Sequence, residues 1–371
     1  RYAVGFSGEG TDSERAAAAQ FTFDGTHVAF LISPTQEEVK QAKKDKKKKE
    51  DQPKKKLGIM DLSDGKVTEV ERVKSFGMPE EAGGWVAYLM EEAPKPKDKT
   101  EKTAEGEAAK KPEEKAEDEE KTKKEKKFGT DLVLRALRDG SETILASVLD
   151  YRFTKDGRNL FYTVSSKDEP GTDGIYRLEP GRKESTALLT GEGNYSKWAL
   201  DKEETRLAFL TDRDDYEADE PSFNLYGCRI GEPEAQLWVS HASTAAFPEG
   251  MAVSDKSGVS FSEDGGIVLF GIKEIPEPKG DEEESEEEEA KFDLWHWDDP
   301  YPQPQQKSMA QRVRDNPWES VYHIADEKFV KLADETIPDV SLSDNGRVGF
   351  AVTDWPYTKR VSYFGSFSDV Y

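Results

Sequence analysis

The chain has 371 residues and a formal net charge of −24, from 77 acidic and 53 basic side chains. This balance argues against a nucleic-acid partner, because phosphate binding needs a net basic surface. No apolar run approaches the roughly 18 residues that a membrane span requires. The chain begins with Arg1 and shows no secretory signal pattern, which predicts a processed form or part of a longer protein.

A short unit recurs along the chain, and its clearest copy runs from Phe261 to Phe270. The pattern predicts a strand end, a tight Asp264-Gly265 turn and a continuous apolar strand, Ile267–Phe270. Asp-Gly favours a turn because Asp caps its own backbone and Gly accepts a positive φ. An apolar strand without polar alternation is typical of burial on both faces.

Looser copies of this unit carry their turns at Asp24, Asp156, Asp201 and Asp344, and a degenerate copy spans Met78–Tyr88. Between them lie alternating strands with hairpin turns, at Leu57–Lys66, Leu132–Gly140 and Ile175–Leu178. The interval from Asp156 to Asp201 is 45 residues, the length of one four-stranded blade. We therefore predict an all-β fold, a single β-propeller over residues 1–371, with about six blades present as a whole ring or as part of a seven- or eight-bladed one.

Three charged tracts interrupt the repeats: a lysine-rich run at 40–56, a mixture of Lys, Glu, Ala and Pro at 94–127, and an acidic run at 280–290. Their composition cannot bury enough surface to offset the entropy of ordering. We expect mobile insertions between strands, which limited proteolysis would cut first. An electrostatic tether for another chain is the functional alternative.

The candidate catalytic and metal-binding residues do not form a recognisable site in the sequence. Ser7 resembles the serine of a G-x-S-x-G elbow, but Glu9 replaces the second glycine and no buried strand precedes it. No ligand spacing links the four histidines, His27, His241, His296 and His323. We expect no metal, no cofactor and no catalytic residue in this span.

Two further features are best explained as structural. Cys228 is predicted to be a small core or edge residue of a strand, because a single cysteine forms no internal disulfide. The carboxylate-rich loop Thr211–Glu220 lacks the Gly and Glu positions of an EF-hand, so a solvated loop is favoured over a calcium site.

Residues Phe292–Gln306 have the sequence Phe-Asp-Leu-Trp-His-Trp-Asp-Asp-Pro-Tyr-Pro-Gln-Pro-Gln-Gln. This segment resembles part of the propeller domain of bacterial members of the prolyl oligopeptidase family of serine peptidases, in the dipeptidyl peptidase and acylaminoacyl peptidase branches. Similar stretches are Ser257–Gly265, Thr211–Tyr216 and Tyr357–Tyr371. The resemblance therefore covers most of the chain outside the charged tracts.

The same segment predicts an alternating strand over Phe292–Trp297 and a loop in the Pro-rich run that follows, since Pro cannot continue a strand ladder. Two interpretations of Trp295-His296-Trp297 stay open. The three side chains either pack a blade around a hydrogen-bonded imidazole or form a wall facing a substrate chamber.

The resemblance implies a propeller followed by an α/β-hydrolase domain with a Ser-Asp-His triad, whose serine lies in a G-x-S-x-G elbow. This sequence contains no such elbow, so no triad residue is carried over. Some relatives bind the substrate amino terminus through paired propeller glutamates. The pairs Glu80-Glu81 and Glu203-Glu204 fall in repeat turns, and we do not assign that role to them.

Two functions are therefore considered. The resemblance implies a propeller that limits which short peptides reach a C-terminal α/β-hydrolase domain of the same parent chain, in the periplasm or outside the cell. The alternative is a stand-alone propeller, similar to the TolB type, that acts as a protein-binding platform. The Phe-Ser-x-Asp-Gly repeat is common to both, and the segment Phe292–Gln306 favours the first.

Overall fold

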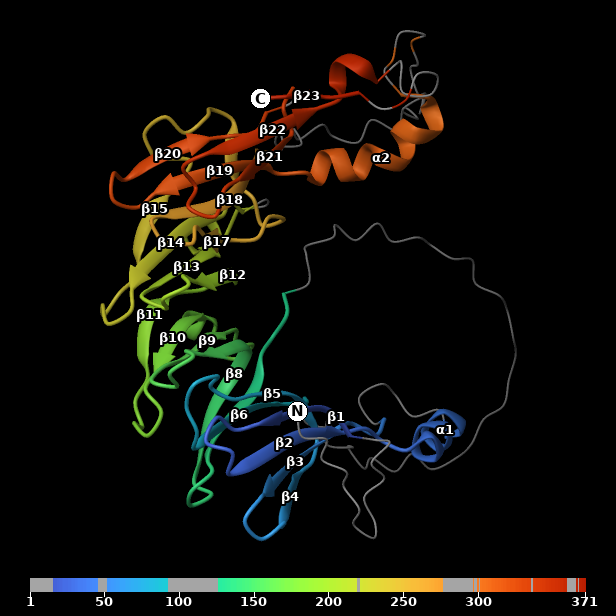
Figure 1. The fold of residues 1–371 in the computed structure, drawn as a ribbon, viewed down its shortest axis with the longest axis vertical. Helices are drawn as coiled ribbons and strands as arrows, with labels where there is room; N and C mark the ends of the chain where they lie inside the picture. The colour runs from blue at the N-terminus through green and yellow to red at the C-terminus, as the bar shows by residue number, and fades with distance from the viewer. Residues whose placement is uncertain are drawn as a thin grey trace, which may run out of the picture. The chain divides into compact units, whose positions relative to one another are not determined.

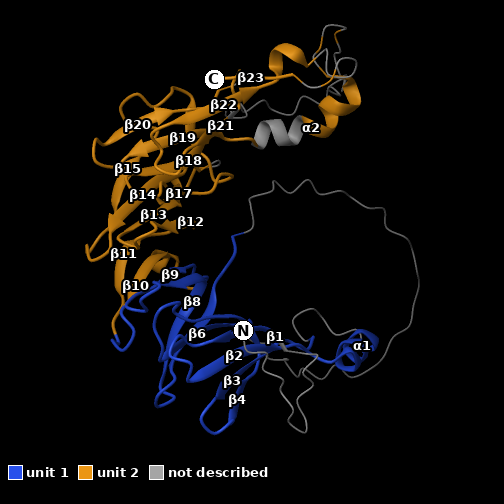
Figure 2. Ribbon diagram, in the orientation of Figure 1, with its two compact units in different colours: residues 1–167, 179–183 blue, residues 168–178, 184–371 orange. Residues whose placement is uncertain are grey.

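The computed structural model describes residues 16–45, 52–92, 126–218, 221–275, 296, 299, 301–334, 336–358, 365 and 367–371. These residues form antiparallel strands with two α-helices, as Figure 1 shows. The chain divides into two compact units (Figure 2). Unit 1 comprises Arg1–Lys167 with Glu179–Lys183, and unit 2 comprises Asp168–Leu178 with Glu184–Tyr371.

Unit 1 contains two runs of antiparallel strands that follow the order of the chain. The first run is β1 (Ala16–Phe21), β2 (His27–Ile32), β3 (Lys56–Asp61) and β4 (Val67–Val70). The second run is β5 (Val73–Gly77), β6 (Trp85–Met90), β7 (Thr130–Ala136), β8 (Glu142–Phe153) and β9 (Leu160–Val164). Four antiparallel strands in chain order are the repeating unit of a β-propeller.

Strand β8 belongs to two successive repeats. Its residues Glu142–Val148 pair with β7, and Val148–Phe153 pair with β9. Ser147, with a φ of 55°, lies where the partner changes. One 12-residue strand therefore ends one repeat and begins the next.

Unit 2 repeats this arrangement. It contains the hairpin β10 (Gly174–Leu178) and β11 (Thr186–Thr190), followed by β12 (Tyr195–Leu200), β13 (Arg206–Thr211), β14 (Asn224–Arg229) and β15 (Gln236–Val239). The next sheet contains β16 (Met251–Val253) and β17 (Ser260–Phe261), both paired with β18 (Ile267–Glu274), then β19 (Trp318–His323) and β20 (Lys328–Lys331). The last sheet contains β21 (Asp339–Leu342), β22 (Gly349–Thr353) and β23 (Asp369–Val370).

The predicted fold class is confirmed, because all five predicted turns join antiparallel strands. The joined pairs are β1–β2, β8–β9, β12–β13, β17–β18 and β21–β22. The degenerate copy forms β5–β6, and the second recurring unit forms β3–β4, β7–β8 and β10–β11. The fold is all-β and consists of antiparallel sheets of the β-propeller type. The number of blades in a closed ring stays a prediction.

The second strand of a repeat is the buried one, as its unbroken apolar sequence predicts. In β18, Val268, Phe270 and Ile272 are at most 1% exposed. They belong to the core cluster of unit 2. The last repeat differs, because Phe350 of β22 is 55% exposed.

The lysine-rich tract 40–56 is not a structureless insertion throughout, which corrects the prediction. Residues Gln36–Lys44 form helix α1, which buries Ala42. Thr35 and Glu38 form a capping box, in which each side chain accepts from the other residue's backbone N–H. Lys43 and Lys44 lie in the last turn, where positive charges interact favourably with the helix dipole. At the other end of the tract, Lys56 begins β3.

The Pro-rich run after Trp297 was expected to be a loop, and that prediction is wrong from Gln303 onwards, whereas Asp299, Tyr301 and Pro302 lie outside helices and strands. Helix α2 begins at Gln303 and ends at Asp315. The Pro302 carbonyl accepts from the N–H groups of Gln305 and Gln306 at 2.9 and 3.0 Å. Pro304 is tolerated because the first turn of a helix does not use the N–H that proline lacks.

Several predictions fall outside the described residues. They concern Ser7, the acidic tract 280–290, most of the tract 94–127 and, apart from His296, the strand Phe292–Trp297. In the part of the chain that the structure describes, neither helix has the length and apolar character needed to cross a membrane.

Candidate functional site

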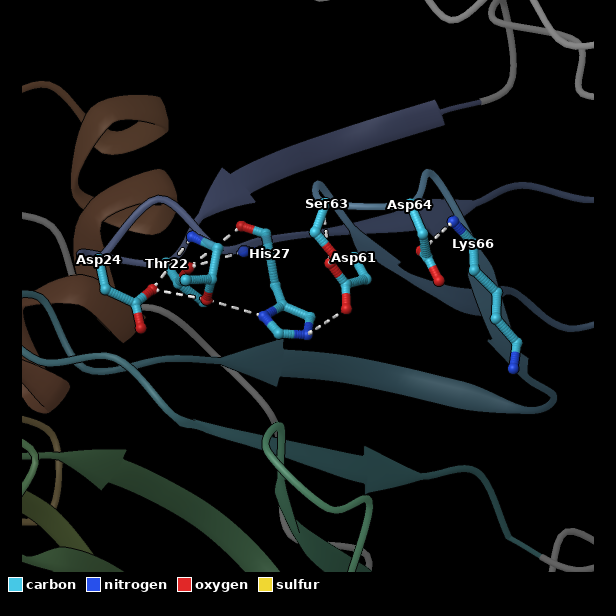
Figure 3. Close-up of polar contacts among 8 residues, drawn as sticks. Thr22, Asp24, His27, Asp61, Ser63, Asp64 and Lys66 are labelled. Carbon is cyan, nitrogen blue, oxygen red and sulfur yellow. Dashed lines mark hydrogen bonds and ion pairs between the residues drawn. The ribbon is translucent and has the colours of Figure 1, made fainter.

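One hydrogen-bonding scheme builds four of the five repeat turns. In the clearest example, the Ser262 hydroxyl accepts from the N–H of Ile267 at 3.0 Å and donates to Asp264 Oδ1 at 2.7 Å. Asp264 Oδ1 also accepts from the N–H of Gly266 at 3.0 Å. Gly265 has a φ of 67°, which glycine adopts without steric cost. Equivalent hydroxyls belong to Thr22, Thr154 and Ser343, and Figure 3 shows the Thr22 turn.

The turn at Asp344 uses a different capping residue from the predicted one. Asn345 Oδ1 accepts from the Ser343 hydroxyl at 2.9 Å and from the N–H of Arg347 at 3.0 Å. Asn345 therefore occupies the position of Asp264, and Asp344 is the variable residue before it.

The Asp201 turn departs from the scheme. Asp201 Oδ1 accepts from the N–H groups of Thr205 and Arg206, both at 2.6 Å, and its Oδ2 accepts from the Thr205 hydroxyl at 2.8 Å. Glu204 takes the glycine position with a φ of 52°. Asp201 is thus equivalent to Ser262, which corrects the predicted alignment: the 45-residue interval measured from Asp156 is two residues short.

Turns of successive repeats contact one another within each unit. In unit 1 the N–H of Glu81 donates to the carbonyl of Lys155 at 2.7 Å, and in unit 2 the N–H of Glu263 donates to the carbonyl of Asp344 at 2.6 Å. We call these contiguous turns the turn surface of each unit. In unit 1 it comprises Thr22–His27, Met78–Gly84 and Thr154–Asn159; in unit 2 it comprises Asp201–Arg206, Ser262–Ile267 and Ser343–Val348.

The two glutamate pairs lie on these turn surfaces, as the repeat predicts. Glu80 lines a pocket of about 310 Å³ with residues 75–78 and 150–153, and Glu81 does not line it. Arg152 and Asp150 give this pocket charges of both signs. Because only one member of the pair lines the pocket, the geometry does not support joint binding of one ammonium group there by both glutamates.

The turns make stability sensitive to acid. The Thr22 hydroxyl lowers the pKa of Asp24, and the N–H of Gly266 lowers the pKa of Asp264. A carboxyl whose folded pKa lies below its unfolded value of about 3.9 stabilises the fold above that pH, and the contribution is lost as pH falls through the folded pKa. We expect the urea midpoint to change little between pH 7 and 5 and to fall below about pH 4.

Asp264→Asn provides the matched control for this prediction, since Asn345 already performs the same capping in neutral form. The variant should lose less of its midpoint on acidification than the natural chain does. Equal midpoints for the natural chain at pH 5 and pH 3 would contradict a role for these carboxylates.

The stretch Thr211–Tyr216 forms a fixed loop after β13 in unit 2, and its carboxylates accept hydrogen bonds from protein donors. Asp212 is 1% exposed and accepts from the N–H and the side-chain amide of Asn194, at 2.6 and 2.7 Å. Asp214 Oδ2 accepts from the Tyr226 hydroxyl at 2.7 Å and from the Asn224 amide at 2.8 Å. These bonds outweigh the opposing effect of burial and lower the pKa of Asp214.

Arg213 joins this loop to the loop before β12, and sequence analysis missed it. Its guanidinium donates to the Thr190 carbonyl at 3.2 Å and lies over the Tyr226 ring, 5.4 Å from the centroid. A Cβ at Gly191 would come within 2.7 Å of Arg213 Cδ. The two glycines of Gly191-Glu192-Gly193 are the feature of the sequence that could have indicated this contact, because a side chain at either position would collide with Arg213.

The remaining candidates are dispersed. His27 contacts the Thr26 hydroxyl at 2.8 Å through Nδ1 and Asp61 Oδ2 at 3.9 Å through Nε2 (Figure 3). Cys228 is 3% exposed in β14, as predicted, and burial raises its pKa to about 12, which keeps the thiol protonated. Among the described residues, no three His, Cys, Asp or Glu side chains are grouped to hold a metal ion.

No family model and no curated protein matches the chain. TolB from Acinetobacter baumannii is similar over 86% of this chain and 54% of its own, at 12% identity and a TM-score of 0.35. A structure from a study of two prolyl endopeptidases is similar over 91% and 46%, at 14% identity and 0.36. The propeller domain of the Trilobed protease from Pyrococcus furiosus is similar over 91% and 77%, at 11% identity and 0.38.

The chain thus spans about half the length of the first two of these structures. At such identities and TM-scores, the comparisons assign the chain to no family. The class of protein follows instead from its own topology: an all-β chain of propeller-type sheets.

Proposed function

We propose that this chain is the propeller portion of a serine exopeptidase or oligopeptidase related to the prolyl oligopeptidase family. The observation that carries the proposal is the segment Phe292–Gln306, whose aromatic and Pro-Gln pattern resembles that family. The propeller-type sheets and the rigid Thr211–Tyr216 loop, a second stretch of resemblance, support it. The chemistry would lie in a C-terminal α/β-hydrolase domain of the same parent chain, and the substrate would be a short peptide.

In this proposal the propeller limits access to the active site and makes polar contacts with the peptide, and it supplies no reacting group. The turn surfaces suit such a role because their backbones are fixed by the hydrogen bonds of each turn and by contacts between turns. Their variable residues, such as Phe23, Lys155 and Glu263, differ in charge and size from repeat to repeat. Such variation can discriminate among peptides without altering the scaffold. A periplasmic or extracellular location is part of the same proposal.

The test is labelling of the complete natural protein with a fluorophosphonate probe, followed by peptide mapping. We expect one serine to be labelled stoichiometrically, outside residues 1–371. Acyl transfer needs an activated nucleophile, its base and an oxyanion hole. This sequence carries no G-x-S-x-G elbow, which would supply the nucleophile and part of the oxyanion hole. Replacing the labelled serine with alanine should reduce turnover of dipeptide and acyl-amino-acid substrates by several orders of magnitude.

Labelling of any serine within residues 1–371 would overturn the assignment of the chemistry to another domain. Absence of labelling and of peptidase activity in the complete protein would favour the alternative, a protein-binding platform. One observation points to that alternative: Phe350 and Val370, on the last sheet, are 55% and 68% exposed, and Val348, directly before β22, is 70% exposed. Grouped exposed apolar side chains are typical of protein-binding surfaces.

A further inference from the structure

Asn345 is chemically distinct from the other asparagines of the chain. The sequence has five, and the other four precede Leu, Tyr, Leu and Pro at positions 160, 195, 225 and 317. Asn345 alone precedes glycine. A glycine nitrogen can approach a neighbouring side-chain carbonyl carbon more freely than any other, because no Cβ restricts its backbone. Asn345 therefore carries the sequence context in which an asparagine side chain reacts most readily with its own main chain.

The structure places this pair on an exposed turn that can open locally. Asn345 lies in the β21–β22 hairpin, where its Oδ1 is held by the Ser343 hydroxyl and the N–H of Arg347. The N–H of Gly346 donates to the Ser343 carbonyl at 2.7 Å. One contact with the neighbouring turn, from the N–H of Glu263 to the Asp344 carbonyl, opposes opening. Val348, at the end of the turn, and Phe350 beyond it are largely exposed, so little buried surface adds to that opposition. In the closed turn the Gly346 nitrogen is therefore held in a hydrogen bond, and it becomes free to react when the turn briefly opens.

We propose that Asn345 is a site of spontaneous deamidation. In the open turn the main-chain nitrogen of Gly346 attacks Cγ of Asn345, so that an N–Cγ bond forms. The Cγ–Nδ2 bond then breaks, and ammonia leaves with the proton of the Gly346 N–H. Water hydrolyses the resulting cyclic imide. Cleavage of the new N–Cγ bond gives aspartate, and cleavage on the other side, at the main-chain carbonyl, gives isoaspartate.

The aspartate product fits the turn. Asp24, Asp156 and Asp264 occupy the same position in their turns and accept the same two kinds of hydrogen bond. Deamidation to aspartate therefore keeps the turn and adds one negative charge to the turn surface of unit 2, beside Asp344. The isoaspartate product adds a methylene to the main chain and cannot keep the pairing of Ser343 with Val348, whose N–H donates to the Ser343 hydroxyl at 3.2 Å.

The test is incubation of the full chain at mildly acidic and mildly alkaline pH, followed by trypsin digestion and mass spectrometry. The peptide Leu332–Arg347 contains a single asparagine, Asn345. We expect its mass to rise by about 1 Da, as amide is replaced by acid, and the rise to be faster at alkaline pH. A synthetic peptide of the same sequence serves as the unfolded reference. It should react at least about tenfold faster, if closing the turn is worth about 1.4 kcal/mol.

The variant Asn345→Asp tests the fit of the product separately from the rate. Its urea midpoint at pH 7 should equal that of freshly purified natural chain, whereas Asn345→Ala, which has no acceptor, should unfold at lower urea. No mass shift in Leu332–Arg347 would overturn the proposal, as would an equal shift at Asn159 or Asn194. A lower midpoint for Asn345→Asp than for the natural chain would overturn the claim that aspartate preserves the turn.

Discussion

Replacing Asp201 with alanine is expected to lower the free energy of unfolding by about 2–4 kcal/mol. Asp201 is 5% exposed, and its carboxylate is the acceptor for the N–H groups of Thr205 and Arg206. Hydrogen bonds to a charged acceptor are stronger than neutral ones. Removing the acceptor leaves these two N–H groups and the Thr205 hydroxyl without their partner in a partly buried turn. The loss should appear as a lower urea midpoint with an unchanged slope.

Asp156→Ala is the matched control for this prediction. In its turn the Thr154 hydroxyl still accepts from the N–H of Asn159, and it can donate to the Asn159 carbonyl at 3.3 Å after it loses Asp156. Only the exposed N–H of Arg158 is then left without an acceptor in the turn. We expect a clearly smaller loss than for Asp201→Ala. In the other turns a hydroxyl and a carboxylate share the capping, whereas Asp201 accepts these hydrogen bonds alone. Equal losses of unfolding free energy for the two variants would contradict this special role of Asp201.

This difference between the turns also shows what the sequence could reveal. The five hairpins were predictable because turn residues, which include an Asp-Gly pair in three of them, are followed by apolar runs. Such patterns depend on local backbone preference and on burial, both of which are visible in the sequence. The residues that perform the capping were less predictable. Asp201 replaces a hydroxyl residue, and Glu204 takes a backbone conformation that usually favours glycine. The same turn therefore forms with residues that differ from those of the repeat.

The helices and the Arg213 contacts were missed for different physical reasons. The composition of the lysine-rich tract correctly indicated poor burial. Helix α1 nevertheless forms, since its capping box supplies stabilisation that depends on two residues alone. Arg213 was recognisable only as part of a polar run, because its partners Thr190 and Tyr226 are distant in sequence. Which long-range partners such a side chain meets depends on strand pairing, which residue patterns specify only in part.

Phe270→Ala is expected to cost about 3–5 kcal/mol of unfolding free energy, because it removes a buried aromatic ring and leaves a cavity. Phe270 is 1% exposed in β18 and lies within the core cluster of unit 2. Its ring centroid is 6.1 Å from that of Phe329. Urea unfolding followed by circular dichroism measures the effect, and the midpoint should fall more than for Asp264→Asn on the turn surface of unit 2.

Phe350→Ala provides the comparison, since Phe350 lies on the second strand of the last repeat and is 55% exposed. Removing a ring that is already in water forfeits little burial, so the loss should stay below about 0.5 kcal/mol, as for other surface positions. A loss for Phe350→Ala as large as for Phe270→Ala would mean that another surface covers β22 in solution. It would then favour the protein-binding alternative, because the exposed apolar residues of the last sheet would belong to an interface between molecules.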